Sequence, residues 1–123
     1  MAVILLIESN SVMRPALRSL LENDGETVVT AMDVPGALSM LPHIQDVDLI
    51  VADVLMPPLD SVALVKRLRT HVHYQTLPLL VFSMEGNGKL RQQVLKAGAT
   101  DFLSAPFTVQ ELQKSVKKLL ISL

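Results

Sequence analysis

Five short apolar runs, separated by longer segments of helical periodicity, limit what this chain can fold into more than any other feature of its sequence. The runs are rich in Val, Ile and Leu, and they predict strands at residues 2–7, 26–31, 48–52, 78–82 and 100–103. In 3–7 and 49–52 the apolar residues do not alternate with polar ones, which is typical of strands buried on both faces. These two strands are therefore expected in the interior of a parallel sheet.

The segments between the runs carry apolar stripes at helical spacing, together with residues that begin and end helices. A first helix is predicted from Val12 to Leu21, with Gly25 where a C-terminal cap is expected. Asp33 and Pro35 predict the cap and first turn of a second helix. The stripes predicted to face the core are Val12, Ala16, Leu17, Leu20 and Leu21; Ala37, Leu38 and Leu41; Leu64, Val65 and Leu68 after a start near Asp60; Leu90, Val94 and Leu95 before Gly98; and Val109, Leu112, Val116, Leu119 and Leu120 in a helix that opens with the capping box Thr108–Glu111.

Strands that alternate with helices predict an α/β fold, here a doubly wound (βα)₅ sandwich of the flavodoxin-like kind. Right-handed crossovers together with a doubly wound order place the first and third strands side by side, and the five-stranded parallel sheet is expected to have the order 2-1-3-4-5. The 123 residues contain no internal repeat and no Ser/Gly linker, so residues 1–123 are predicted to form one domain. Such folds bind ligands beyond the carboxyl ends of their central strands.

Composition removes several classes of function. Eleven Lys or Arg against twelve Asp or Glu leave a formal charge of −1, so neither direct nucleic-acid binding nor a membrane surface is expected as a partner. The absence of Cys excludes disulfides, thiolate zinc sites and a Cys nucleophile. The apolar opening lacks a basic segment before it and no run reaches membrane-spanning length, so a cytoplasmic location is expected.

Polar side chains gather at the predicted carboxyl edge of the sheet. Glu8 and Ser9 follow the first strand, Asp53 the third, Ser83 the fourth, and the segment 105–107 the fifth. Two neighbouring carboxylates would repel each other unless a divalent cation such as Mg²⁺, or a proton, lay between them. The spacing alone also allows the plainer interpretation, in which the acids end their strands and stay solvated.

Other sites are disfavoured by the same sequence. His71 and His73 are two residues apart, which does not place them on one helix face, and no third zinc ligand is near. Gly86–Gly88 lacks the Lys-Ser/Thr ending of a phosphate-binding loop. A flavin would favour aromatic flanks, but Tyr74 is the only Tyr and there is no Trp.

Ordered motifs along the chain resemble those of response-regulator receiver domains. They are Ile4–Asn10, Val47–Pro57, Leu77–Ser83, Ala97–Phe102 and Pro106–Phe107. The resemblance covers essentially the whole chain, and the order and spacing of five segments make it far more specific than any single motif. It implies a cytoplasmic signalling protein that accepts a phosphoryl group, and not an enzyme beyond self-catalysed phosphotransfer and dephosphorylation.

The resemblance also assigns roles by position. Asp53 would be the phosphoacceptor, and Glu8, Asp53 and the Leu55 carbonyl would hold Mg²⁺. Ser83 and Phe102 would be the switch residues that reposition on activation. The implied partners are a histidine kinase or phosphotransfer protein and a downstream effector, reached through the face of the fourth helix, fifth strand and fifth helix. A homodimer through that face and a cis Ala105–Pro106 bond are further expectations of the same kind.

The chain departs from the family pattern at four positions near the site. Ser9 replaces an acid that normally ligates the metal, and Ala105 replaces a lysine before the proline of the fifth loop. Ser61 and Met84 stand where smaller residues are usual. A hydroxyl is a poorer ligand than a carboxylate, and the missing ammonium removes a charge-assisted contact with a phosphoryl oxygen. Weak Mg²⁺ binding is expected.

Two functions remain open from the sequence. The first is a phosphoryl-accepting switch in a phosphorelay. The second is a pseudo-receiver, which would act as a protein-interaction module without phosphorylation. The losses at Ser9 and Ala105 favour the second function, whereas the retained Asp53 and Ser83 favour the first.

Overall fold

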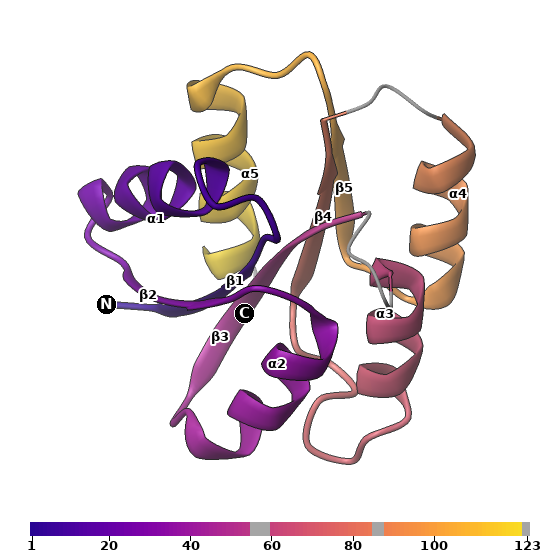
Figure 1. Ribbon diagram of the computed structural model, residues 1–123. Coiled ribbons are helices and arrows are strands. Elements are labelled where there is room, and N and C mark those ends of the chain that lie inside the picture. The colour runs from indigo at the N-terminus through magenta and orange to yellow at the C-terminus, as the bar shows by residue number, and fades with distance from the viewer. Residues whose placement is uncertain (55–59, 85–87, 122–123) are drawn as a thin grey trace.

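The computed structural model describes residues 1–54, 60–84 and 88–121, and it contains one parallel five-stranded sheet. The strands are β1 (Val3–Ile7), β2 (Thr27–Ala31), β3 (Val47–Asp53), β4 (Leu79–Ser83) and β5 (Asp101–Ser104). Their order is β2-β1-β3-β4-β5, as predicted (Figure 1). Every strand boundary lies within one residue of its prediction. The predicted interior position of the first and third strands is confirmed, and β4 is equally interior, with all five residues buried.

The helices are α1 (Met13–Asn23), α2 (Val34–Met40), α3 (Ser61–Arg69), α4 (Gly88–Ala97) and α5 (Val109–Ile121), with a short 3₁₀ turn, η1 (Leu41–His43), after α2. Several of the predicted helix-end signals are confirmed. Asp33 accepts a hydrogen bond from the backbone N–H of Gly36, and Thr108 and Glu111 form the reciprocal bonds of a capping box. Within the described residues, no helix has the length and apolar character needed to cross a membrane.

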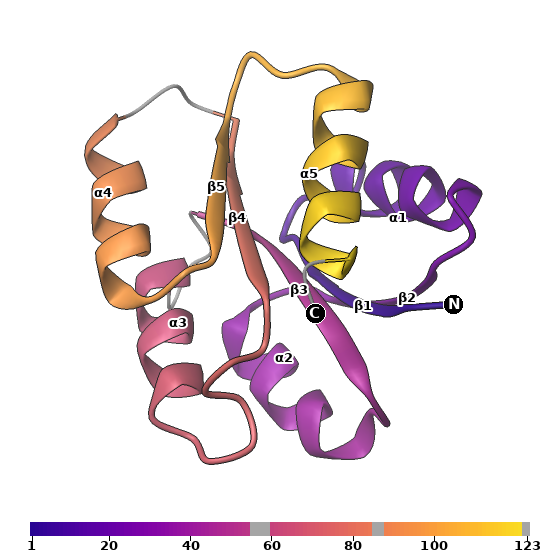
Figure 2. The same cartoon turned by 180° about the vertical axis from the view of Figure 1, so that it is seen from behind.

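The helices cover the sheet on both faces and divide the core into two layers. Figures 1 and 2 show α1 and α5 on one face and α2, α3 and α4 on the other. Successive residues of a strand point to opposite faces, so each strand contributes to both layers. In β1, Ile4 and Leu6 pack under α1 and α5, whereas Leu5 and Ile7 pack under the other three helices.

Three residues of the predicted apolar stripes, Val12, Ala16 and Val109, are exposed and do not lie in the core. Val12 is 78% exposed and Val109 is 45% exposed. Val12 and Val109 stand at the start of their helices, before the first full turn has reached the sheet, so helical spacing does not determine which way they face. Ala16 lies within α1, on the side that the sheet does not cover. Leu17 and Leu21 of the first stripe are buried as predicted.

Arg69, at the end of α3, ties three segments together. Its Nε donates to the carbonyl of Gly98 at 2.8 Å, and its Nη1 donates to the carbonyls of Tyr74 and Leu77 at 3.0 and 2.7 Å. Burial lowers the pKa of Arg69 from its ordinary value. Gly98 has φ +120°, and a Cβ built there would lie 2.8 Å from the Arg69 Cγ, so only glycine fits beside this arginine. The arginine thereby joins α3 to the loop that follows α4.

Candidate functional site

The first and third strands bring two carboxyl groups together at the carboxyl edge of the sheet. Ile7 of β1 pairs with Ala52 of β3, so the next residues along, Glu8 and Asp53, lie side by side. They line a cavity of about 510 Å³ together with Ser9, Asn10, Val12, Met13 and Met84. Glu8 is only 2% exposed, although it lines this opening. The expected convergence of Glu8 and Asp53 is therefore seen, and the plainer interpretation of a fully solvated Glu8 is wrong.

Glu8 is held in place by the start of α1. Its Oε1 accepts from the backbone N–H of Asn10 at 3.1 Å, and its own carbonyl accepts from Arg14 Nη1 at 3.0 Å. Its Oε2 is buried and has no hydrogen-bond partner among the described residues. Burial, and then repulsion from Asp53, raise the pKa of Glu8 to about 7. A carboxyl group in this state is ready to take up a cation or to keep its proton.

The raised pKa of Glu8 makes stability depend on pH in a defined direction. Folded Glu8 keeps its proton up to about pH 7, whereas in the unfolded chain the same group loses it near pH 4.5. The stabilisation by this proton is thus complete below pH 4.5 and is lost as the pH rises to about 7. In metal-free buffer, Glu8→Gln should match the parent chain near pH 4.5 and exceed its free energy of unfolding by on the order of 1 kcal/mol above pH 7.

Urea unfolding across this pH range, in the presence of a chelator, measures the difference between the two chains. Glu22→Gln is the matched control, because Glu22 is an exposed glutamate of α1 outside the cavity. A difference between Glu8→Gln and the parent that stays constant with pH would contradict the prediction.

Asn10 and Arg14 are site residues that the sequence interpretation missed. The Asn10 Oδ1 accepts hydrogen bonds from the backbone N–H groups of Val12 and Met13 at 2.8 and 2.9 Å, which stabilises the start of α1. The backbone N–H of Asn10 donates to the carboxylate of Glu8. The available signal was the preference of Asn for helix starts. For Arg14 no local pattern exists, because its partner is a backbone carbonyl six residues earlier.

The predicted switch residues lie on neighbouring strands. Ser83 ends β4 and is 1% exposed, and Phe102 lies in β5 and is 4% exposed in the core layer under α2, α3 and α4. The carbonyl of Phe102 accepts from Arg91 Nη1 at 3.2 Å, which connects α4 to β5. The Ala105 N–H donates to the Ser83 carbonyl at 2.8 Å, so the position where the family has a lysine lies beside the end of β4. The expected cis bond between Ala105 and Pro106 is present.

The other two departures lie at different places. Met84 is 49% exposed and forms part of the cavity wall, so the larger side chain at this position takes up space at the site. Ser61 is fully buried as the first residue of α3, and its hydroxyl donates to the backbone carbonyl of Asp53. It thus supports the end of β3 and does not line the cavity. The predicted Leu55 carbonyl ligand lies outside the described residues.

The donors present fit a weakly held divalent cation. Two carboxyl groups lie together, and one of them has a buried oxygen without a hydrogen-bond partner among the described residues. Oxygen donors of this kind suit Mg²⁺. Within those same residues, no group of three or more His, Cys, Asp or Glu side chains gathers around a common point. Ser9, in place of a third carboxylate, accounts for that shortage.

The family model for the response regulator receiver domain matches residues 4–117. The chain belongs to this family. Response regulator MprA of Mycobacterium ulcerans is 35% identical to it over 117 residues, which are 95% of this chain and 49% of MprA, so the chain spans about half of that relative. A chemotaxis protein CheY homolog of Campylobacter jejuni is 28% identical over 118 residues, covering 95% of this chain and 91% of the homolog. The structure of chemotaxis protein CheY4 of Vibrio cholerae matches with a TM-score of 0.89 and 29% identity, over 98% of this chain and 99% of that one.

Receiver domains share a general role in signal transduction. Receiver domains are phosphoryl acceptors in two-component signalling, not turnover enzymes, and they generally bind Mg²⁺ where they are phosphorylated. Response regulators interact with histidine kinases and with effectors. The fold and the family expected from the sequence are both confirmed.

Proposed function

We propose that this receiver domain accepts a phosphoryl group on Asp53 and holds it weakly. The observation that carries the proposal is the placement of Asp53 at the end of β3, beside a nearly buried Glu8 with an oxygen available for a cation. An Asp53 carboxylate oxygen would attack phosphorus in line, forming an O–P bond as the bond from phosphorus to the donor's imidazole nitrogen breaks. The imidazole leaves and regains a proton from solvent.

Each nearby group has a part in this proposal. Mg²⁺, when bound, would neutralise charge on the phosphoryl oxygens. Glu8 and Asp53 would hold the ion, with the Leu55 carbonyl as a third donor, and the Ser83 hydroxyl would donate to a phosphoryl oxygen. Ala105 offers no ammonium to the same group, which supports a short-lived phosphorylated state.

The output side of the proposal is the face formed by α4, β5 and α5. The bond between Arg91 and the Phe102 carbonyl links α4 to the strand that carries the proposed switch ring. Movement of Ser83 and Phe102 would therefore reach α4 directly. In this proposal the phosphoryl group comes from a histidine kinase or phosphotransfer protein. An effector or a second copy of the chain would bind the face of α4, β5 and α5, and the protein would act in the cytoplasm.

Intact-protein mass spectrometry after incubation with Mg²⁺ and a small phosphodonor tests the proposal. The expected result is one added phosphoryl group, absent in Asp53→Asn. Asp46→Asn is the matched control, since Asp46 is an exposed aspartate on the loop before β3 and has a left-handed φ of 57° that Asn also adopts. No adduct at any Mg²⁺ concentration, in chain shown to be folded by circular dichroism, would contradict the proposal.

A pseudo-receiver is the second candidate. It is favoured by the joint loss of a carboxylate at Ser9 and an ammonium at Ala105, with Met84 on the cavity wall. In that case Asp53→Asn would leave binding to every partner unchanged, whether or not a phosphodonor is present.

A further inference from the structure

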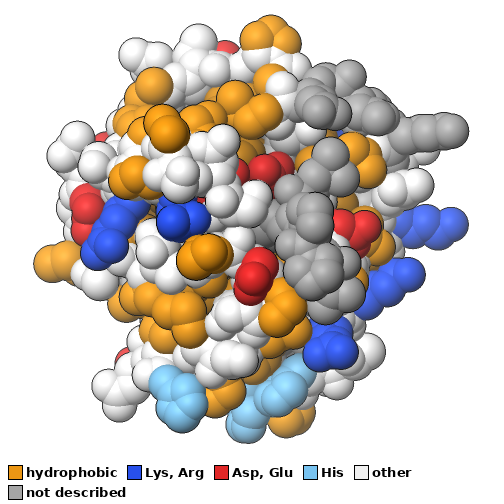
Figure 3. All heavy atoms as spheres, in the orientation of Figure 1, with side chains coloured by type: hydrophobic (Ala, Val, Ile, Leu, Met, Phe, Trp, Pro, Cys, Tyr) orange, Lys and Arg blue, Asp and Glu red, His pale blue; other side chains and the backbone are white. Residues whose placement is uncertain are grey.

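The near-zero net charge of this chain hides a strong separation of charge along it. Residues 61–100 contain six Lys or Arg and a single acid, Glu85, whereas the rest of the chain contains five Lys or Arg and eleven Asp or Glu. Neither α3 nor α4 carries an acidic residue. Figure 3 shows Lys and Arg side chains along one edge of the molecule, over these two helices. The basic region is therefore a surface formed by two helices. The net charge of the whole chain does not reveal it, because acidic residues elsewhere cancel its positive charge.

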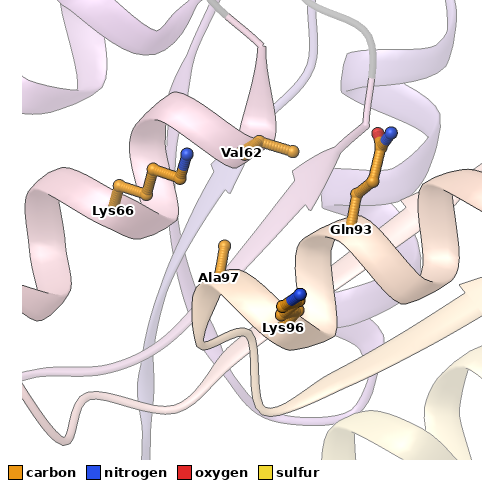
Figure 4. A pocket seen from close by; sticks show the side chains of 5 residues that line it. All are labelled: Val62, Lys66, Gln93, Lys96 and Ala97. Carbon is orange, nitrogen blue, oxygen red and sulfur yellow. The ribbon is translucent and has the colours of Figure 1, made fainter.

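A groove of about 490 Å³ lies between these helices, lined by Val62, Lys66, Gln93, Lys96 and Ala97; we call it the α3–α4 groove. Figure 4 shows Val62 and Lys66 on α3 and Gln93, Lys96 and Ala97 on the neighbouring α4, around the space between the two helices. Val62 and Ala97 are partly buried and form an apolar floor, and each helix contributes one exposed lysine. The groove thus combines a small apolar contact area with a positive charge on each wall.

Among the described residues, no acid forms an ion pair with Lys66 or Lys96. In the described part of the chain, the only ion pair joins Arg18 Nε to Glu22 Oε2 on α1, at 3.3 Å. The walls are also fixed in position, because Arg69 of α3 donates to the carbonyl of Gly98 just after α4. A groove held open in this way binds a ligand without first ordering its own helices, which favours affinity.

We propose that the α3–α4 groove binds an acidic peptide segment of a partner protein. Carboxylates of the segment would pair with Lys66 and Lys96, and a small apolar side chain between them would rest on Val62 and Ala97. The exposed amide of Gln93 would hydrogen-bond the segment's backbone. The described residues that line the groove do not overlap with those that line the cavity at Asp53, so this binding does not require phosphorylation.

The shape and chemistry of the groove favour a peptide over other anions. Single-stranded nucleic acid is held by aromatic side chains on which bases stack, and none of the described lining residues is aromatic. A bilayer needs a broad basic face with apolar residues that insert, whereas the apolar residues here lie between two helices. A chain segment with carboxylates on either side of a small apolar residue matches both the charge and the floor.

The test is an NMR titration of the full chain with a synthetic peptide in which Glu and Asp alternate with Ala and Leu. Amide shifts are expected to change mainly in α3 and α4, and the affinity should fall as salt is raised. Lys66→Glu with Lys96→Glu should weaken binding about tenfold or more, since two attractive pairs become repulsive. Gln93→Glu, which leaves both lysines in place, should weaken it by a smaller factor.

The control variant is Lys117→Glu with Lys118→Glu, which changes the net charge equally at exposed positions on α5. This pair should leave the peptide affinity nearly unchanged, and Asp53→Asn should leave it unchanged as well. The proposal would be overturned if the α5 lysine variant lost as much peptide affinity as the groove lysine variant. Amide shift changes spread over the other helices would also overturn it. Tighter binding of a single-stranded oligonucleotide or of anionic vesicles at the same residues would also overturn it.

Discussion

Combining Ser9→Asp with Ala105→Lys is expected to raise both the Mg²⁺ affinity and the yield of the phosphoryl adduct by about tenfold to a hundredfold. A charge-assisted contact contributes about 1.5–3 kcal/mol where its geometry is good, which corresponds to this range. The two changes cancel in net charge, so the gain would come from local ligands and not from the overall field. This prediction builds on the proposed phosphorylation of Asp53.

The structure supports the geometry that this double variant requires. Ser9 already lines the cavity with Glu8 and Asp53, so a carboxylate there would join the two acids directly. The N–H of Ala105 is bonded to the carbonyl of Ser83, which places a side chain at position 105 beside the end of β4. The long stem of a lysine can reach from there toward a phosphoryl group on Asp53.

Amide NMR titration measures the Mg²⁺ affinity, because the chain has no Trp for fluorescence quenching, and intact mass measures the adduct. Ser19→Asp with Ser39→Lys is the matched control, since it introduces the same charges at exposed positions away from the cavity. A gain of equal size in the control pair, or none in the site pair, would show that Ser9 and Ala105 do not limit the site.

Arg69→Ala is expected to lower the free energy of unfolding by about 3 kcal/mol, or roughly 10 °C in Tm. The substitution removes the charged donor that serves the carbonyls of Gly98, Tyr74 and Leu77. Each carbonyl then loses a hydrogen bond that contributes about 1 kcal/mol. The loops before β4 and after α4 would separate from α3 as a result.

Chemical denaturation followed by circular dichroism measures this loss. Arg67→Ala is the matched control, because Arg67 is an exposed arginine of the same helix, and it should change stability by no more than about 0.5 kcal/mol. Arg69→Lys should fall between the two, since one ammonium cannot reach all three carbonyls. Equal effects of Arg69→Ala and Arg67→Ala would contradict the role given to Arg69.

The fold was predictable because its signals are local and repeated. Strands buried on both faces read as unbroken apolar runs, and the helix ends at Asp33, Gly25 and Thr108 follow from backbone hydrogen bonding within a few residues. The exposure of Val12 and Val109 was not predictable in this way. Helical spacing places a residue on a face of its helix, but where the helix meets the sheet decides whether that face is covered.

The site was only partly predictable for a related reason. Residues that end strands, such as Glu8, Asp53 and Ser83, can be placed at one edge from the topology alone. Arg14 acts through a backbone carbonyl six residues earlier, so no local sequence pattern marks it. The preference of Asn for helix starts marks Asn10 as a helix-start residue but not its bond to Glu8, and the sequence marks Ser61 as a departure from the family pattern but not its support of the Asp53 carbonyl. The resemblance to the receiver family supplied the chemistry of Asp53 and identified the departures at Ser9 and Ala105.

The sequence by itself determined the architecture, the family and the residues that meet at the carboxyl edge. Hydrophobic periodicity and the order of motifs can be recognised along the chain without knowing which residues are close in space. Only the tertiary structure decided that Glu8 is buried with an oxygen lacking a partner among the described residues. It also decided that Arg69 fixes α3 to the loop after α4, and that two lysines distant in sequence face one groove. The physical reason is that burial, desolvation and the summing of charge depend on distance in space, which folding sets.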